Sequence, residues 1–365
     1  MKDGNWLFNL LLYRSSPTGL SRYVERLLSA WSEATGIQLP RQLRVDAGGG
    51  VELTNGNGLP REQRSLSMRW LQGNALVQHA VPVRRLVTQA APDLIYSPYT
   101  DRLLSVRDCP QVITCHDLTP LHWPSSRRAY WRSRFWLSRH LKGATAVVAI
   151  SRYVADLLVA DGFPAERITV IPNGIEPVTD PVFAPAGDDL LLLARHARNK
   201  NIALALKGFA RFIALETAWM GRLVVVGNSG RETPALQRLE RQLGLQDRVH
   251  WRSYLTEGEL ERQWRSSWAL LSTSLMEGFD YPLLEAQAHG LPTLASRIPV
   301  HLELHSDVAL FVDVEDDGVN LAFNLQRLAR DPGLWQQLSQ AGRRNAQHLS
   351  LNRQCRCIQQ LLSSL

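Results

Sequence analysis

Short apolar, β-branched runs alternate with longer helical patterns from one end of the chain to the other. Strands that are linked by helices must pair in parallel, with helices covering both faces of the sheet. This alternation therefore predicts an α/β protein. The runs that predict strands lie at residues 6–13, 43–46, 93–96, 112–115, 146–150, 169–171, 190–194, 223–226, 249–251, 269–272, 293–295 and 309–312.

The alternation is interrupted at "PVTDPVFAPAGDD", which has three prolines and few apolar residues, as a linker does. We therefore expect an N-terminal domain at 1–176, a linker at 177–189, a C-terminal domain at 190–350 and a last helical stretch at 351–365. Ligands bind beyond the carboxyl ends of the strands in doubly wound, Rossmann-like sheets, so two such domains on a hinge would face each other across a ligand cleft. The glycine-rich segments at 48–50 and 52–60 are expected to be a flexible loop.

Composition excludes several other classes of protein. With 45% hydrophobic and 21% charged residues, the chain of 365 residues is neither disordered nor fibrous. No run approaches the roughly 18 apolar residues that a membrane span needs, and residues 6–13 are too short for a signal peptide. The cysteines at 109, 115, 355 and 357 lack C-x-x-C spacing, which favours a reducing, cytoplasmic location.

The stretch "STSLMEGFDYPLLEAQAHGLPTLAS" follows a predicted strand. It places Glu277 in a loop before a helix and Glu285 on that helix about two turns later, on the same side. Gly278 and Phe279 would offer backbone N–H groups at the positive end of the helix, where anions are stabilised. Carboxylates accept hydrogen bonds from sugar hydroxyls, so the combination indicates a nucleotide-sugar site. The alternative is an ordinary amphipathic helix with two solvent-facing glutamates.

A second pattern, "ARHARNKN", follows the first strand of the C-terminal half. It carries Arg195 and Lys200, and both a guanidinium fork and a compact ammonium suit a diphosphate. A solvated basic turn is the alternative. In the N-terminal half, His116 and Asp117 follow the strand of "ITCHDLTPLHWP". Asp117 could hold the imidazole's orientation or meet an acceptor hydroxyl, and the sequence leaves both open.

The segment "PTGLSRYVERLLSAW" predicts a tight loop at Gly19 and Leu20 before a helix. Neither G-x-G-x-x-G nor GKS/T is present, so nicotinamide-binding and P-loop sites are not supported. The sequence also has no metal-ligand cluster, Gly-x-Ser-x-Gly elbow or catalytic Cys/His pairing.

The form "EGF-x-x-x-L-x-E-A-x-x-x-G-x-P", from residue 277 to residue 292, resembles the E-x7-E region of retaining GT-B glycosyltransferases of family 4, and "HDL" resembles its mannosyltransferase-like members. The resemblance implies a GT-B fold and transfer of a hexose from a nucleotide-diphosphate sugar to a hydroxyl of a glycan or lipid-linked glycan. It implies neither a metal nor a cofactor, and it makes GDP-mannose the first candidate donor. It also implies that the last helix returns to the N-terminal domain.

The resemblance also assigns roles to the candidate residues. Arg195 and Lys200 would neutralise the departing diphosphate, and Gly19 would lie in a loop that approaches the donor phosphates. Glu277 would bind sugar hydroxyls and Glu285 the ribose. His116 would contact the donor sugar near the reacting carbon, on the face opposite Glu277. A nucleotide-sugar epimerase of the same architecture is the nearest alternative.

Net charge raises a question about partners. The chain carries +7 at pH 7, and residues 1–180 have 21 basic and 15 acidic side chains. Residues 118–155 contain no acid, and "RRAYWRSRFWLSRHLK" predicts an amphipathic helix. Its cations and tryptophans suit an anionic membrane on the inner face of the cell. Single-stranded nucleic acid and a plain solvated helix are the alternatives, although no nucleic acid is expected if the chain is a glycosyltransferase. The side chains concerned are Arg128, Arg132, Arg139, Trp131 and Trp136.

Overall fold

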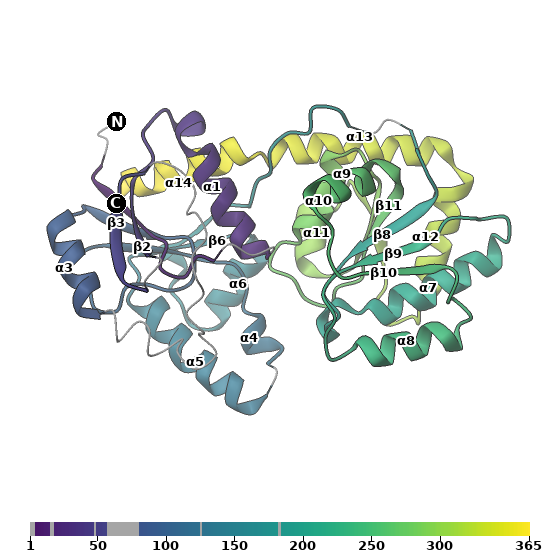
Figure 1. Cartoon of the computed structure of the whole chain (residues 1–365), viewed down its shortest axis with the longest axis horizontal. Helices are drawn as coiled ribbons and strands as arrows, with labels where there is room; N and C mark the ends of the chain where they lie inside the picture. The colour runs from purple at the N-terminus through teal and green to yellow at the C-terminus, as the bar shows by residue number, and fades with distance from the viewer. Residues whose placement is uncertain (1–3, 15–17, 47–48, 57–79, 125, 182–183) are drawn as a thin grey trace. The chain divides into compact units, whose positions relative to one another are not determined.

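The computed structural model describes residues 4–14, 18–46, 49–56, 80–124, 126–181 and 184–365 (Figure 1). Its contacts divide the chain into two compact units. Unit 1 comprises Met1–Glu176 and Leu349–Leu365, and unit 2 comprises Pro177–His348. Each unit is built around one largely parallel sheet, so the predicted α/β class with two Rossmann-like halves is confirmed.

Unit 1 has a seven-stranded sheet of order β3-β2-β1-β4-β5-β6-β7. Its strands are β1 (Trp6–Asn9), β2 (Arg41–Val45), β3 (Val51–Thr54), β4 (Leu94–Ser97), β5 (Gln111–Cys115), β6 (Ala146–Ala149) and β7 (Ile168–Val170). Its described helices are α1 (Gly19–Thr35), α3 (Ala80–Ala90), α4 (Thr119–His122), α5 (Arg127–Lys142), α6 (Arg152–Ala160), the 3-10 turn η1 (Ala165–Arg167) and α14 (Leu351–Ser364).

One strand of unit 1 corrects the prediction. Residues 52–54 were expected in a loop, but together with Val51 they form β3, which pairs antiparallel with β2 in the register Val45↔Val51. The turn between the two strands closes because the Asp46 N–H donates to the Gly50 carbonyl and the Gly50 N–H donates to Asp46 Oδ1, both at 2.9 Å. The expectation of purely parallel pairing is therefore wrong at this edge. The rest of the predicted loop, at 47–48 and 57–60, lies outside the described residues.

The start of α1 corrects a second expectation. Thr18 is the N-cap of α1, and its side chain accepts from the Ser21 N–H. Gly19 and Leu20 therefore lie in the first helical turn and not in a loop before it. The helix buries one face against the sheet, with Tyr23 and Trp31 fully enclosed.

The end of the chain returns to unit 1, where α14 packs along α1. The buried face of α14 includes Ile358, which is fully enclosed. A parallel bridge joins Ile175 to Ser350, and Gly174 N–H donates to Gln354 Oε1 at 2.7 Å. A Cβ at Gly174 would lie 2.4 Å from the Ser350 backbone, so this crossing requires glycine.

Unit 2 has a six-stranded parallel sheet of order β10-β9-β8-β11-β12-β13, the order of a dinucleotide-binding fold. Its strands are β8 (Asp189–Leu193), β9 (Leu223–Val226), β10 (Val249–Arg252), β11 (Ser267–Ser272), β12 (Thr293–Ser296) and β13 (Ala309–Val312). Its helices are the 3-10 turn η2 (Arg198–Lys200), α7 (Ile202–Leu215), α8 (Thr233–Gln242), α9 (Glu257–Ser266), α10 (Tyr281–Ala288), α11 (Pro299–His305), α12 (Val319–Arg330) and α13 (Pro332–His348).

Candidate functional site

The strand order of unit 2 reverses beside β8, whose two neighbours are β9 and β11. In open α/β sheets such a reversal marks the place, at the carboxyl ends of the strands, where ligands bind. The chain leaving β8 runs into η2, and the chain leaving β11 runs through residues 273–280 into α10. These two segments carry the predicted donor-binding residues.

Lys200 and Glu277 meet at this edge of the sheet. Lys200 Nζ donates to Glu277 Oε1 in an ion pair, and the two side chains are only 18% and 14% exposed. The backbones are tied as well, because Thr273 Oγ1 donates to the carbonyls of Lys200 and Asn201, at 3.0 Å each. The adjacency of β8 and β11 thus joins two residues that lie 77 positions apart in the sequence.

Electrostatics keep the Lys200 ammonium charged. Burial alone would lower the pKa of Lys200, but the carboxylates of Glu277 and Asp280 outweigh burial and raise it above its ordinary value. Arg195 lies two residues after the end of β8, is exposed, and acts on the Lys200 pKa in the opposite sense. Both predicted cations therefore lie at the same edge of the sheet.

The segment after β11 differs in detail from the prediction. Helix α10 begins at Tyr281 with Asp280 as its N-cap, so Gly278 and Phe279 precede the cap, and the Phe279 side chain is buried. Glu285 lies inside α10, as predicted, and is only 6% exposed. The alternative interpretation, in which both glutamates face solvent, is wrong.

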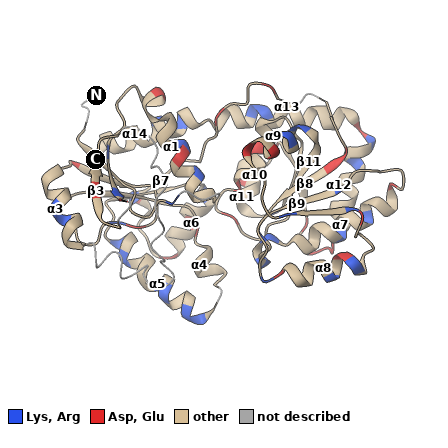
Figure 2. Cartoon of the chain, in the orientation of Figure 1, with Lys and Arg blue, Asp and Glu red and all other residues tan. Residues whose placement is uncertain are grey.

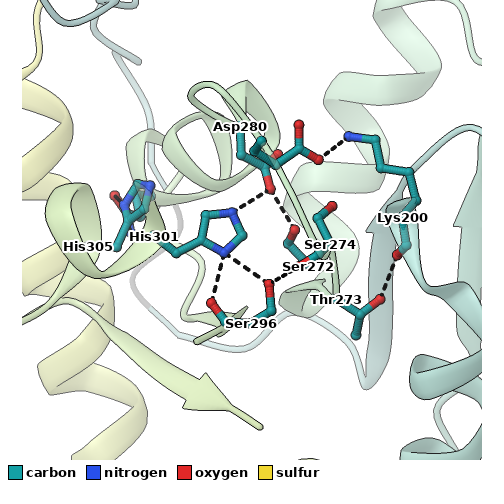
Figure 3. A network of polar contacts seen from close by, with 10 residues as sticks. Lys200, Ser272, Thr273, Ser274, Asp280, Ser296, His301 and His305 are labelled. Carbon is teal, nitrogen blue, oxygen red and sulfur yellow. Dashed lines mark hydrogen bonds and ion pairs between the residues drawn. The ribbon is translucent and has the colours of Figure 1, made fainter. Parts of the chain in front are cut away.

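Sequence reasoning missed a buried polar network next to this pair (Figure 3). Asp280 accepts from Ser272 Oγ at 2.5 Å and from His301 Nε2 at 3.1 Å. Burial alone would raise the Asp280 pKa, but the hydrogen bond from His301 and the charge of Lys200 outweigh burial and lower it well below its usual range. The available signal was Asp280 itself, an N-cap residue type just before a Tyr-Pro start. No local pattern distinguishes His301.

In unit 1, His116 directly follows β5 and is half-buried. Its Nε2 lies 2.9 Å from the Pro98 carbonyl, and the Tyr23 ring meets it edge-on with centroids 4.5 Å apart. A carbonyl only accepts, so Nε2 carries a proton. Burial lowers the His116 pKa, and a neutral ring then has Nδ1 as an acceptor. His116 is thus suited to accept a hydrogen bond from a hydroxyl.

The other predicted residues of unit 1 lie nearby in the fold. Asp117 is exposed, and its Oδ1 accepts from the Thr119 N–H at 2.9 Å. Of the two roles that the sequence left open for Asp117, orienting the imidazole therefore has no support, because the Pro98 carbonyl and Tyr23 position the ring. Gly19 is exposed in the first turn of α1, the helix that follows β1.

Helix α5 presents cations and aromatic rings to solvent. Figure 2 shows its basic positions, and Arg128, Arg132 and Arg139 are all exposed. Trp131 is 68% exposed, whereas Trp136 is half-buried. The buried end of the helix is formed by His140 and Leu141. Tyr130 and Leu137 are only half-buried because the helix packs on unit 1 mainly through this end.

Comparison with known families assigns both halves of the chain. Residues 17–178 match the family described as "Glycosyltransferase Family 4", and residues 187–331 match "Glycosyl transferases group 1". Together with the strand order and the strand-end site, these matches show that the chain belongs to the family 4, group 1 glycosyltransferases.

Among curated relatives, the O-antigen chain mannosyltransferase RfbU of Salmonella typhimurium is 28% identical over 57% of this chain and 58% of its own. The mannosylfructose-phosphate synthase of Agrobacterium fabrum is 28% identical over 56% of this chain and 49% of its own. The chain thus spans about half the length of these relatives. Anabaena Alr3699/HepE, solved with UDP-glucose, superimposes with a TM-score of 0.74 over 99% of both chains at 17% identity, which shows the GT-B fold.

Across the described ranges, no helix is both long enough and apolar enough to span a bilayer. The described residues also contain no group of three or more His, Cys, Asp or Glu that is placed to bind a metal ion. The expectation of metal-independent chemistry stays a prediction.

Proposed function

We propose that this protein is a retaining glycosyltransferase that moves a hexose from a nucleotide-diphosphate sugar to a hydroxyl of a glycan or lipid-linked glycan. One observation carries the proposal: the half-buried Lys200–Glu277 ion pair at the carboxyl edge of unit 2, beside the paired strands β8 and β11. A cation and a carboxylate held side by side match a donor that consists of a diphosphate and a sugar.

In this proposal the charges of unit 2 act on the leaving group. Lys200 and Arg195 stabilise the negative charge that develops on the diphosphate, an effect that is strong where water is excluded. Lys200 exchanges its partner Glu277 for a phosphate oxygen when the donor binds, which leaves Glu277 able to accept from the sugar hydroxyls. Glu285 accepts from the ribose. The leaving phosphate assists deprotonation of the acceptor, so the anomeric configuration is kept without a protein nucleophile.

The choice of donor rests on the relatives. Those named as mannosyltransferases support mannose and therefore GDP-mannose, whereas the fold neighbour that was solved with UDP-glucose supports a uridine donor. We propose GDP-mannose first. The O-antigen and lipopolysaccharide enzymes among the relatives support a cell-surface glycan as the acceptor.

Thermal unfolding with a panel of nucleotides and sugar nucleotides tests the donor site. A ligand that binds only the folded state raises the melting temperature, by an amount that grows with its concentration relative to Kd. GDP and GDP-mannose are expected to give the largest rise. A larger rise with UDP and UDP-glucose would overturn the choice of base, and no rise with any of them would contradict the glycosyltransferase proposal.

Turnover separates the transferase from the epimerase of similar architecture. A transferase releases the nucleoside diphosphate at a rate that depends on a glycan acceptor, and the anomeric configuration of the product, read by NMR, reports retention. Conversion of the sugar nucleotide without any acceptor would support the epimerase instead.

We further propose that α5 binds an anionic membrane surface, next to which a lipid-linked acceptor would lie. Each Arg or Lys near such a surface contributes about 1 kcal/mol to binding, and an exposed tryptophan suits the interface.

Vesicles of phosphatidylglycerol should bind the protein, and vesicles of phosphatidylcholine should not. Arg128→Glu, Arg132→Glu and Arg139→Glu together should abolish binding. The same reversal at Arg238, Arg241 and Arg262, which are exposed in unit 2, should leave most of it. Equal losses in the two triple variants would contradict a specific role for α5.

A further inference from the structure

Asp280 has an unusual backbone conformation for a residue with a side chain. Its φ of 75° and ψ of 73° place it in the left-handed region, which glycine adopts at no cost and Asp only with some strain. A glycine here would suffice to start α10. The presence of a carboxylate in this conformation therefore points to a function of the Asp280 side chain, which is only 4% exposed.

Hydrogen-bond acceptors face both nitrogens of the His301 ring. Nε2 faces Asp280 Oδ2 at 3.1 Å, and Nδ1 faces the Ser296 carbonyl at 3.0 Å and Ser296 Oγ at 3.2 Å. Ser296 Oγ uses its own proton on the Ser274 carbonyl at 2.5 Å, so it too accepts from His301. A carbonyl and an ionised carboxylate only accept, so a ring with protons on both nitrogens would satisfy all of these contacts.

The network connects three places that shape the candidate donor site (Figure 3). Ser272 ends β11, Ser296 ends β12, and Asp280 caps α10. The loop between β11 and α10 carries Glu277, so its two ends are fixed by hydrogen bonds to the network. His301 itself is fully buried on α11.

Charges within this cluster balance in pairs. Lys200 is paired with Glu277, and a protonated His301 would be paired with Asp280. Asp280 also attracts Lys200, since it is one of the two carboxylates that raise the Lys200 pKa. If His301 carried no charge, Asp280 would compete with Glu277 for the ammonium.

On the basis of the proposed function, we infer that Asp280 and His301 are a pair of positioning residues: the His301 imidazolium neutralises Asp280 and so keeps Lys200 beside Glu277, ready for the leaving diphosphate. Neither residue touches the donor. The pair acts through the Lys200 ammonium and through the loop that carries Glu277.

Nitrogen-15 NMR of the histidine rings tests the charge directly and needs no activity. At neutral pH the two His301 nitrogens should both resonate as protonated imidazolium nitrogens, assigned by their loss in His301→Gln. A signal from one protonated and one unprotonated His301 nitrogen would overturn the inference, independently of any measured activity.

Three variants test the positioning role by nucleoside diphosphate affinity, measured by calorimetry with GDP and UDP, and by donor kinetics. His301→Gln keeps an N–H donor but removes the charge, so affinity and kcat should each fall about tenfold or more. Asp280→Asn/His301→Gln removes both charges and should recover to within about threefold of the unchanged protein. If the pair had a purely structural role, the single substitution would lower only the melting temperature, and the double substitution would restore it.

His305→Gln is the matched control, on the same helix. His305 is also buried, but burial lowers its pKa to about 3, so it is neutral and its replacement removes no charge. It should lower stability and leave affinity and kcat unchanged. Equal kinetic losses in His301→Gln and His305→Gln would overturn the inference. Absence of binding and turnover in the unchanged protein would instead contradict the proposed function, and the NMR result would still decide the charge of His301.

Discussion

The two sheets have the same strand order around their first strands, β1 and β8, but their carboxyl edges carry different chemistry. In unit 2 this edge holds the Lys200–Glu277 ion pair and, beside it, the buried carboxylate of Asp280 in contact with His301. In unit 1 it holds neutral hydrogen bonds, such as that from Asn9 Nδ2 to Ser97 Oγ at 2.8 Å.

Behind the unit 1 edge, the hydroxyls of Tyr23, Tyr96 and Thr114 form a buried chain with steps of 2.8 Å. Burial raises the pKa of both tyrosines, so these groups stay uncharged. The comparison teaches that one topology can present charge, as a phosphate requires, or neutral donors and acceptors, as hydroxyls require. Exposed cations of unit 1 lie instead on α5, at Arg128, Arg132 and Arg139.

The largest expected effect comes from the charged edge. Lys200→Ala should lower donor turnover a hundredfold to a thousandfold, the range found when one group that stabilises transition-state charge is removed. Lys207→Ala is the matched control, because Lys207 pairs with Asp317 on the surface of the same unit. Steady-state kinetics with both variants check the prediction, and equal rates would remove the functional distinction between the two edges.

The packing of α14 gives the next largest effect. Ile358→Ala empties space in a fully enclosed position and should lower the stability of unit 1 by about 2–4 kcal/mol. Ser363→Ala, at an exposed position of the same helix, should change it little. Hydrogen exchange resolved by segment would measure both. If Ile358→Ala accelerated hydrogen exchange in unit 2 as much as in unit 1, relative to the unchanged protein, the two units would not be separate in stability.

His116→Gln tests the neutral edge. A lost hydrogen bond to a polar group costs about 1–3 kcal/mol, so kcat should fall about tenfold or more. Nucleoside diphosphate affinity should not change, since this site lies in the other sheet. His122→Gln, on the exposed side of α4, is the control. A loss of nucleoside diphosphate affinity in His116→Gln would contradict the assignment of diphosphate binding to unit 2 alone.

The smallest expected effect concerns unit 2 away from its charged edge. Thr256 and Glu259 form a capping box at the start of α9. Thr256→Ala should lower the stability of unit 2 by about 1 kcal/mol and leave turnover unchanged. Ser253→Ala, exposed just before it, is the control. Denaturant unfolding checks the value, and a fall in turnover would extend the functional region beyond the strand ends.

The sequence predicted most of the sheet because periodicity and apolar runs are local signals. Every predicted strand overlaps an observed one, although the first ends at Asn9, where the side chain turns to Ser97. The strand β3 was missed because residues 51–54 are few, only half-buried and next to glycines. Its pairing comes from the Asp46–Gly50 turn, which composition suggested only as a loop.

The candidate site was predictable only in part. Because parallel strands meet at one edge, Lys200 and Glu277 could be expected to lie together. The partners of Asp280 could not, because they depend on which strand lies beside β11 and on the turn of α11 that orients His301. The direction of the Asp117 carboxylate was likewise set by a local backbone N–H that the sequence pattern does not reveal.

The return of α14 has a consequence for how the protein is made. Unit 1 begins the sequence, yet its helix α1 is covered only when the last residues of the chain are in place. During synthesis, unit 2 therefore leaves the ribosome complete while unit 1 still exposes the side of α1 that α14 covers, and domains generally fold as units as they emerge. Unit 1 is thus synthesised first but completed last. A chain that lacked α14 would leave unit 1 incomplete and unit 2 intact.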